Sequence, residues 1–162
     1  MENLFMREAL NEAEKAAALN EVPVGCVIVY EGRIIGRGHN RRTVEKNSLK
    51  HAEIIAINEA CNFMGDWRLE NCHLFVTVEP CPMCTGAVLL ARMKSLSFGA
   101  WNKKAGACGS VIDILTQEGF NHKVAVNAGL MEAECAALMS SFFARLRGRK
   151  EEFADLDNRH FL

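Results

Sequence analysis

The spacing of hydrophobic residues changes along the chain between helical and strand-like patterns. Near the N-terminus, apolar residues recur every three or four positions, which predicts an opening amphipathic helix. Its apolar positions are Leu4, Phe5, Ala9, Ala13, Ala16 and Ala17. Residues 24–30 (VGCVIVY) and 33–40 (RIIGRGHN) are strand-like runs on either side of Glu31-Gly32, so they predict a β-hairpin.

The rest of the chain predicts further strands alternating with helices. We expect helices at residues 51–64, 81–93 and about 130–147, with a weaker one at Ser110–Leu115. We expect strands at residues 74–78, 95–100 and 123–127. Strands separated by helices need crossover connections, whereas the first hairpin must be antiparallel. The pattern therefore predicts an α/β fold, a three-layer α/β/α sandwich with a five-stranded mixed sheet.

Composition adds limits on domain number and on partners. At 162 residues and 49% hydrophobic content, the chain fits one domain, which we place at 1–150, with an unassigned C-terminal tail at 151–162. Lys and Arg number 19 against 20 Asp and Glu, so any nucleic-acid partner must be bound by a local patch. Because no window has the apolar length of a membrane span and the charged N-terminal stretch does not resemble a signal peptide, we expect a cytoplasmic protein without a membrane partner.

Seven cysteines are too irregularly spaced for a secreted disulfide framework. One pair, Cys81 and Cys84, lies at the predicted start of a helix with Pro82 in its first turn. There the helix dipole stabilises thiolates, so the pair alone is compatible equally with redox chemistry and with zinc binding. The other five are scattered singly in apolar stretches and are expected to be small buried hydrophobes: Cys26, Cys61, Cys72, Cys108 and Cys135.

A third ligand is available at the start of the preceding helix, in His51-Ala52-Glu53. Parallel neighbouring strands bring their helix N-termini to one edge of a sheet, so His51 could face Cys81 and Cys84. Three protein ligands leave the fourth zinc position open for water, as in catalytic sites. Glu53 would then enter the same pocket as a general acid and base. The alternative is that His51 only caps its helix and Glu53 only favours the helix dipole.

His51-Ala52-Glu53 and Pro80-Cys81-Pro82-Met83-Cys84 resemble the signature of the zinc-dependent nucleoside and nucleobase deaminases. Within this superfamily the chain is most similar, from about Arg7 to Arg147, to the bacterial tRNA-specific adenosine deaminases. The matching stretches are EVPVGCVIV (21–29), GHNR (38–41), HAEIIAI (51–57), WRLENCHLFVTVEPCPMC (67–84), FGAWNKKAGACGS (98–110), FNHKV (120–124) and ECAALMSSFFARLR (134–147). The resemblance implies a cytidine deaminase-like fold, one Zn²⁺ per subunit and a homodimer.

The resemblance also implies a reaction. Zinc-bound hydroxide attacks C6 of adenine, and Glu53 passes the proton to N1 and then to the departing amine, so that adenosine becomes inosine. The expected substrate is the adenosine at the first anticodon position of a tRNA, presented by the anticodon stem-loop. Single-stranded loops allow a base to leave its stack and enter such a pocket.

Substrate contacts are carried over from the family by position. They are Asn40, Ala52, Val24, Val78, Asn102, His122, Phe143 and Arg145. Each has a plainer alternative, since Asn40 is also a typical turn residue, valines and phenylalanines often lie in a core, and a lone histidine is often structural. Basic residues at 33–50 and 145–150 are suited to RNA, although such runs also occur on solvated faces.

The chain departs from the family near the pocket. Ser48-Leu49-Lys50 stand where relatives commonly have Pro-Thr-Ala, and Asn102 stands where many have Asp. Because an amide does not repel a nucleic-acid backbone as a carboxylate does, we hypothesise looser discrimination between RNA and DNA.

Two other functions remain open at this point. A free nucleobase or nucleotide deaminase of guanine or cytosine type would have the same zinc site without a need for tRNA. A zinc-stabilised binding module without activity is the second.

Overall fold

The computed structural model describes the backbone of residues 1–159 and the side chains of residues 1–151. Its helices are α1 (Glu2–Ala18), α2 (Ala52–Met64), α3 (Pro82–Leu90) and α4 (Glu132–Arg159). Its strands are β1 (Gly25–Tyr30), β2 (Arg33–His39), β3 (His73–Val78), β4 (Ser95–Ala100) and β5 (Ala125–Ala128). Among the described helices, none has both the length and the apolar character needed to cross a bilayer.

The five strands form one mixed sheet in the order β2-β1-β3-β4-β5. Strand β1 pairs antiparallel with both β2 and β3, whereas β3, β4 and β5 run parallel. The predicted five-stranded mixed sheet with an antiparallel first hairpin is therefore confirmed.

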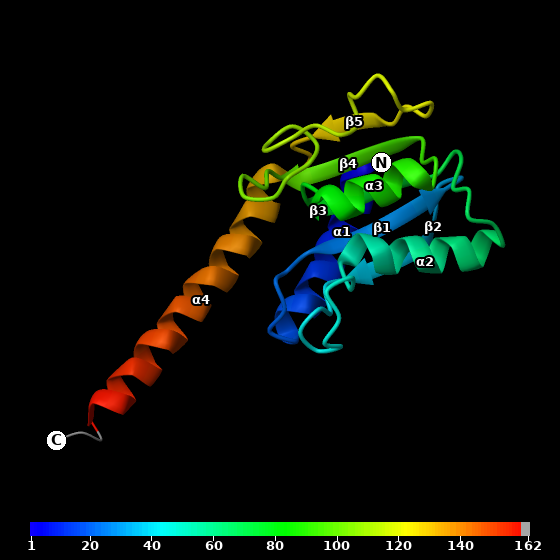
Figure 1. The fold of residues 1–162 in the computed structure, drawn as a ribbon. Coiled ribbons are helices and arrows are strands. Elements are labelled where there is room, and N and C mark those ends of the chain that lie inside the picture. Colours follow the sequence, from blue (N-terminus) through cyan, green and yellow to red (C-terminus); the bar gives the residue numbers. More distant parts are fainter. Residues whose placement is uncertain (160–162) are drawn as a thin grey trace.

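Helices cover both faces of the sheet, which confirms the predicted three layers (Figure 1). Helices α2 and α3 lie on one face, and α1 with the first part of α4 lies on the other. Successive side chains of β3 point to opposite faces of the sheet. Leu74 and Val76 pack toward α2 and α3, whereas Phe75 packs on the α1 side. Beyond the sheet, α4 continues as a long helix that extends away from the body (Figure 1).

Several element predictions need correction. Residues Ser110–Leu115 are not helical; they form turns closed by an isolated bridge between Cys108 and Asp113. The backbone N–H of Ile114, which in a helix over these residues would donate to the Ser110 carbonyl, donates instead to the Ala107 carbonyl at 3.0 Å. In α1, Leu4 is 59% exposed and Met6 takes a buried position instead.

Two helix ends also differ from the predicted ones. Helix α3 ends at Leu90, three residues early, and Arg92 beyond it has a positive φ of 58° that a helix cannot continue through. Helix α4 runs to Arg159 and so extends through the first residues of the predicted tail (151–162), of which residues 160–162 lie outside the described part.

One edge of the sheet collects the segments that carry the candidate chemistry. Strands β3 and β4 end there, at Val78 and Ala100, and the antiparallel β1 begins there at Gly25. Helix α2 also begins at this edge, directly after His51. Residues distant in sequence are thus brought together by strand direction alone.

Close contact between β2 and α2 holds the first turn of α2 at this edge. A Cβ atom on Gly38 would lie 2.1 Å from the Ala52 carbonyl oxygen, and one on Gly36 would lie 2.3 Å from the Ala56 carbonyl oxygen. Because both positions lack a side chain, the helix backbone can approach the strand more closely than any other residue would allow.

We expect Gly38→Ala to lower the free energy of unfolding by about 3 kcal/mol, because its methyl group must push the α2 backbone away. Urea denaturation followed by circular dichroism measures this. Gly86→Ala is the matched control, since a Cβ there meets nothing within 4 Å inside α3, and we expect it to raise stability by about 0.5 to 1 kcal/mol. Equal stabilities of the two variants would contradict the close-contact explanation.

Candidate metal and substrate site

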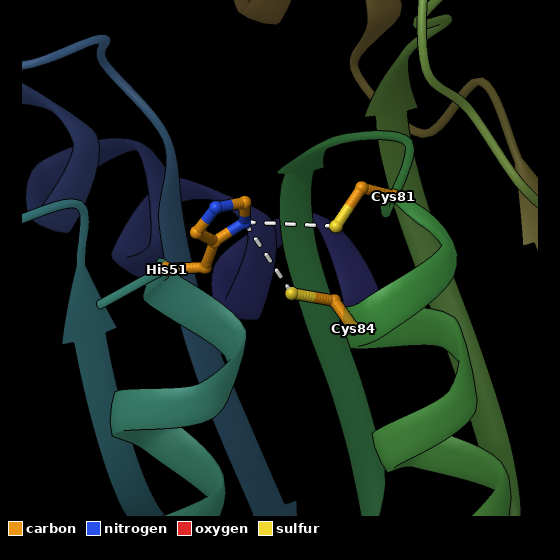
Figure 2. A group of neighbouring side chains, drawn as sticks. All are labelled: His51, Cys81 and Cys84. Carbon is orange, nitrogen blue, oxygen red and sulfur yellow. Dashed lines mark hydrogen bonds between the residues drawn. The ribbon is translucent and has the colours of Figure 1, made fainter. Parts of the chain in front are cut away.

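Two helix N-termini carry the three candidate ligands. His51 is the N-cap residue of α2, with φ −81° and ψ 150°, and its extended backbone turns the ring toward α3. Cys81 is the N-cap of α3, Pro82 occupies the first helical turn, and Cys84 follows one turn later, so the two thiols lie on one side of the helix. Figure 2 shows the imidazole of His51 pointing between the sulfur atoms of Cys81 and Cys84.

The ligand atoms are close together. Nδ1 of His51 lies 3.6 Å from Sγ of Cys81 and 3.6 Å from Sγ of Cys84. All three donor atoms fall within 4.8 Å of one another, and in the described part of the chain this is the one group of three such side chains close enough to hold a metal ion. The structure thus brings together the three ligands predicted from the sequence.

The protonation states of the Cys81 and Cys84 thiols depend on each other. A hydrogen bond from Cys84, followed by one from His51, lowers the pKa of Cys81 to about 4, although burial opposes the shift. The hydrogen bond with Cys81 and burial raise the pKa of Cys84. The hydrogen bond to Cys81 also raises the pKa of His51. One thiolate therefore exists at neutral pH, and a cation bound between the sulfur atoms would favour the second.

Glu53 provides a carboxyl group in the same place. Its side chain is only 3% exposed, and burial raises its pKa, with the charge of Cys81 adding to the effect and His51 opposing it. A raised pKa makes a carboxylate a better proton acceptor, which suits a group that acts first as a general base and then as a general acid. Among the described donor groups it is not one of the metal-ligating set.

A cavity of about 720 Å³ opens beside these residues, and His51, Glu53 and Cys81 lie in its wall. Five of the predicted substrate contacts also line it: Val24, Asn40, Val78, Asn102 and Phe143. Ala52 lies just behind, where its backbone N–H donates to Oδ1 of Asn40 at 3.0 Å. The cavity is large enough for a nucleoside.

Two predicted contacts lie elsewhere in the structure. Nε2 of His122 lies 2.7 Å from the Met93 carbonyl oxygen, near the start of β4 and so at the sheet edge opposite the cavity. Arg145 lines a separate hollow of about 20 Å³ with Asn20 and Phe142. Their roles in RNA binding stay predictions without a contact in the cavity.

The predicted basic surface is partly neutralised. Arg37 pairs with Glu8 and Glu12, and His39 with Glu12. Arg41 and Lys50 both pair with Glu45. Arg42, by contrast, lines the cavity together with Lys103 and Lys104.

The sequence patterns missed several cavity residues. Helix α4 contributes Ala136, Met139 and Ser140, and the segment before β1 contributes the buried Glu21. Glu79 also lines the cavity, although it lies next to the cysteine motif that the sequence does single out. Only the polar residues 102–104 between two predicted elements carried a recognisable signal of a binding loop.

Comparison with known proteins supports the same chemistry. A family model described as MafB19-like deaminase matches residues 2–147. The tRNA-specific adenosine deaminase of Bacillus subtilis is 47% identical over 150 residues, covering 93% of each chain.

Solved structures resemble the fold to different degrees. One from work on A-to-I editing by tRNA:A34 deaminases at the wobble position of transfer RNA superposes with a TM-score of 0.80 and 41% identity, over 83% of this chain and 97% of that one. A guanine deaminase from Bacillus subtilis gives a TM-score of 0.59 and 36% identity over 66% and 69% of the two chains.

Proposed function

The chain belongs to the MafB19-like deaminase family, and on that basis we propose that it deaminates adenosine to inosine at the wobble position of a tRNA. One observation carries the proposal: three potential metal-ligating atoms and a buried carboxyl group lie together at one cavity. The similarity of the chain to tRNA-specific adenosine deaminase identifies the reaction that this arrangement would support. The guanine deaminase alternative is less well supported, because the Bacillus subtilis guanine deaminase is 36% identical over 66% of the chain, whereas the tRNA-specific adenosine deaminase is 47% identical over 93% of it. We assign the deaminase domain to residues 1–150 and keep 151–162 as a tail.

Zinc fits the three ligands. With zinc–sulfur bonds of about 2.3 Å and zinc–nitrogen bonds of about 2.0 to 2.1 Å, tetrahedral coordination separates sulfur from nitrogen by about 3.6 Å. Both measured separations, between Nδ1 of His51 and the two Sγ atoms, are 3.6 Å. Two thiolates and an imidazole are also the donors that zinc prefers. We therefore propose one Zn²⁺ per subunit, which when bound supplies a water molecule acidic enough to react near neutral pH.

Glu53 is the group that moves protons. Its buried carboxylate takes a proton from the attacking water and delivers it to N1 of adenine, then assists the amine as it leaves. The C6–N bond breaks, a C6–O bond forms, and adenosine and water become inosine and ammonia. Burial supports this role because it raises the pKa of Glu53, which favours uptake of a proton by its carboxylate.

Asn40 is proposed to orient the base. Since its Oδ1 accepts the Ala52 N–H at 3.0 Å, its amide NH₂ group remains to donate to a purine nitrogen. Ala52 would therefore act by fixing Asn40. Val24 and Val78 line the cavity as apolar walls, and Phe143 of α4 lies at the same cavity.

The substrate proposed for this site is an anticodon stem-loop. Arg42, Lys103 and Lys104 place positive charge at the cavity, where a phosphate backbone would lie. His122 and Arg145, which do not line the cavity, are assigned to RNA outside it. We further propose a homodimer that works in the cytoplasm, where tRNA is modified.

Asn102→Asp is expected to raise the preference for an RNA hairpin over the matching DNA hairpin. Oδ1 of Asn102 accepts the backbone N–H groups of Lys104 and Ala105, at 3.3 and 3.1 Å. A carboxylate can accept the same two bonds, so the variant changes charge with little change in loop conformation. Deamination rates of matched hairpins measure the effect, and an unchanged ratio would refute the role of this charge.

The proposed function is tested by incubating the purified protein with an anticodon stem-loop that bears adenosine at the wobble position. Inosine at that position, detected by nuclease digestion and mass spectrometry, is the expected result. A stem-loop with adenosine moved one position along the loop is the control. Ammonia released from free guanine or cytosine compounds, without inosine in the RNA, would select the nucleobase deaminase alternative.

A further inference from the structure

Glu79 is a buried carboxylate that the proposed reaction does not use. Its side chain is 1% exposed and lies between the end of β3 and the cysteine motif. Oε1 accepts the backbone N–H groups of Cys108 and Ser110, each at 3.0 Å. Oε2 accepts the backbone N–H of Asn102 at 3.0 Å and the hydroxyl of Ser110. Four donors from residues 102–110 thus converge on one side chain.

These donors belong to one wall of the substrate cavity. Residues 101–105 all line the cavity, and the hydrogen bonds to Glu79 hold both ends of the 102–110 segment. Two backbone bonds attach the same regions: Glu79 N–H donates to the Ala100 carbonyl at 2.8 Å, and Ala107 N–H donates to the Pro80 carbonyl at 2.9 Å. The loop is therefore attached directly to the stretch that leads into Cys81.

Gly106 shows how closely the loop surrounds this carboxylate. A Cβ atom at Gly106 would lie 2.2 Å from Oε2 of Glu79 and 2.6 Å from the Asn102 carbonyl oxygen. No side chain fits between the loop and Glu79. Glu79 borders the cavity, but it is 1% exposed and both of its carboxylate oxygens accept hydrogen bonds from the loop, so its effect passes through the loop.

We propose that Glu79 is a positioning residue that holds the 101–105 wall in its substrate-binding conformation before RNA arrives. The identity of the RNA in this proposal rests on the proposed function. If the wall is ordered in advance, binding of RNA needs no free energy to order it. If the wall is ordered for only a fraction of the time, the apparent affinity for RNA falls in proportion to that fraction. Within the described part of the chain, the hydrogen bonds of the Glu79 carboxylate go to the loop and none goes to His51, Cys81, Cys84 or Glu53, so we expect the proton-transfer step to stay intact.

Glu79→Gln is expected to disturb the hydrogen bonds at Oε2 and to keep those at Oε1. The amide nitrogen placed at Oε2 faces the Asn102 N–H, so two donors meet, while the Ser110 hydroxyl can rotate and accept. The amide oxygen at Oε1 still accepts from Cys108 and Ser110. We expect amide hydrogen exchange to accelerate by about tenfold or more at Asn102 and much less at Cys108 and Ser110.

The kinetic expectation is a rise of about tenfold in KM for the anticodon stem-loop, with kcat and metal content within about twofold of the wild-type values. A merely structural role would instead lower the active fraction, and so kcat, at constant KM. Gly106→Ala attacks the same contact from the loop side and is expected to raise KM similarly. Ser110→Ala removes one donor but keeps all three backbone bonds, and serves as the control with KM nearly unchanged.

An unchanged KM in both Glu79→Gln and Gly106→Ala would overturn the proposal. Unchanged exchange at Asn102 would overturn it as well, and that measurement needs no RNA. If the wild-type protein made no inosine while exchange at Asn102 accelerated in Glu79→Gln, the substrate assignment would fail and the anchoring of the loop by Glu79 would be supported. The two failures are thereby distinguished.

Discussion

Replacing Glu53 by Gln is expected to lower kcat on the wobble-adenosine stem-loop by about 10³-fold while zinc content stays unchanged. Glutamine has nearly the same volume, so the buried site remains filled, but an amide cannot take up and return a proton. The rate is measured under single-turnover conditions as inosine formed, and metal is measured by mass spectrometry of the same sample. If the variant keeps its metal, the loss of activity is due to the missing proton carrier and not to a missing metal ligand.

Glu59→Gln is the matched control for this prediction. Glu59 lies on α2 as well, but it is exposed and accepts the Arg37 N–H, a role that glutamine can keep. Its activity is expected to equal that of the wild-type protein. Full activity of Glu53→Gln would remove Glu53 from the reaction, and joint loss of metal and activity would make it a structural part of the metal site.

Replacing Cys84 by Ser is expected to abolish both metal binding and deamination. The substitution removes one of the three proposed protein ligands and offers a hydroxyl that stays protonated at neutral pH in place of a thiolate. Changes outside the ligand set already weaken metal binding by about 10- to 100-fold, so loss of a ligand is expected to exceed about 100-fold. Equilibrium dialysis against a zinc buffer measures the affinity independently of activity.

Cys61→Ser controls for the loss of a thiol as such. Cys61 lies on α2, away from the metal-ligating group, and its Sγ donates to the Trp67 carbonyl at 3.8 Å, as a hydroxyl also can. We expect normal zinc content and activity for it. If Cys84→Ser bound zinc as the wild-type protein does, the assignment of His51, Cys81 and Cys84 as the ligand set would be wrong.

The candidate metal ligands could be predicted because they are local signals. Cys81 and Cys84 are one helical turn apart, and His51 and Glu53 lie two residues apart at a helix start, so spacing alone indicates a shared direction. Strands β1, β3 and β4 were equally clear, because strands buried on both faces are short runs of mainly apolar, β-branched and aromatic residues.

The cavity wall could not be predicted because it joins distant segments. Met139 and Ser140 reach the site from α4, and nothing in their local pattern distinguishes them from other residues of that helix. Glu79 stands within the cysteine motif, but its partners Asn102 and Ser110 are 23 and 31 residues away. The wrong helix at Ser110–Leu115 has the same origin, since Glu79 holds Ser110 in the loop and the Ile114 N–H, which a helix would pair with the Ser110 carbonyl, donates to the Ala107 carbonyl instead.

The placement of the metal ligands on helix N-termini, apart from the segments that enclose the substrate, has an evolutionary consequence. The candidate ligands His51, Cys81 and Cys84 lie in the first turns of α2 and α3, whereas much of the rest of the cavity wall comes from residues 101–105 and from α4. Mutations can therefore accumulate in the walls without disturbing the ligands. Such a division lets one ancestral reaction centre diversify toward new substrates, and it explains how a guanine deaminase shares this fold.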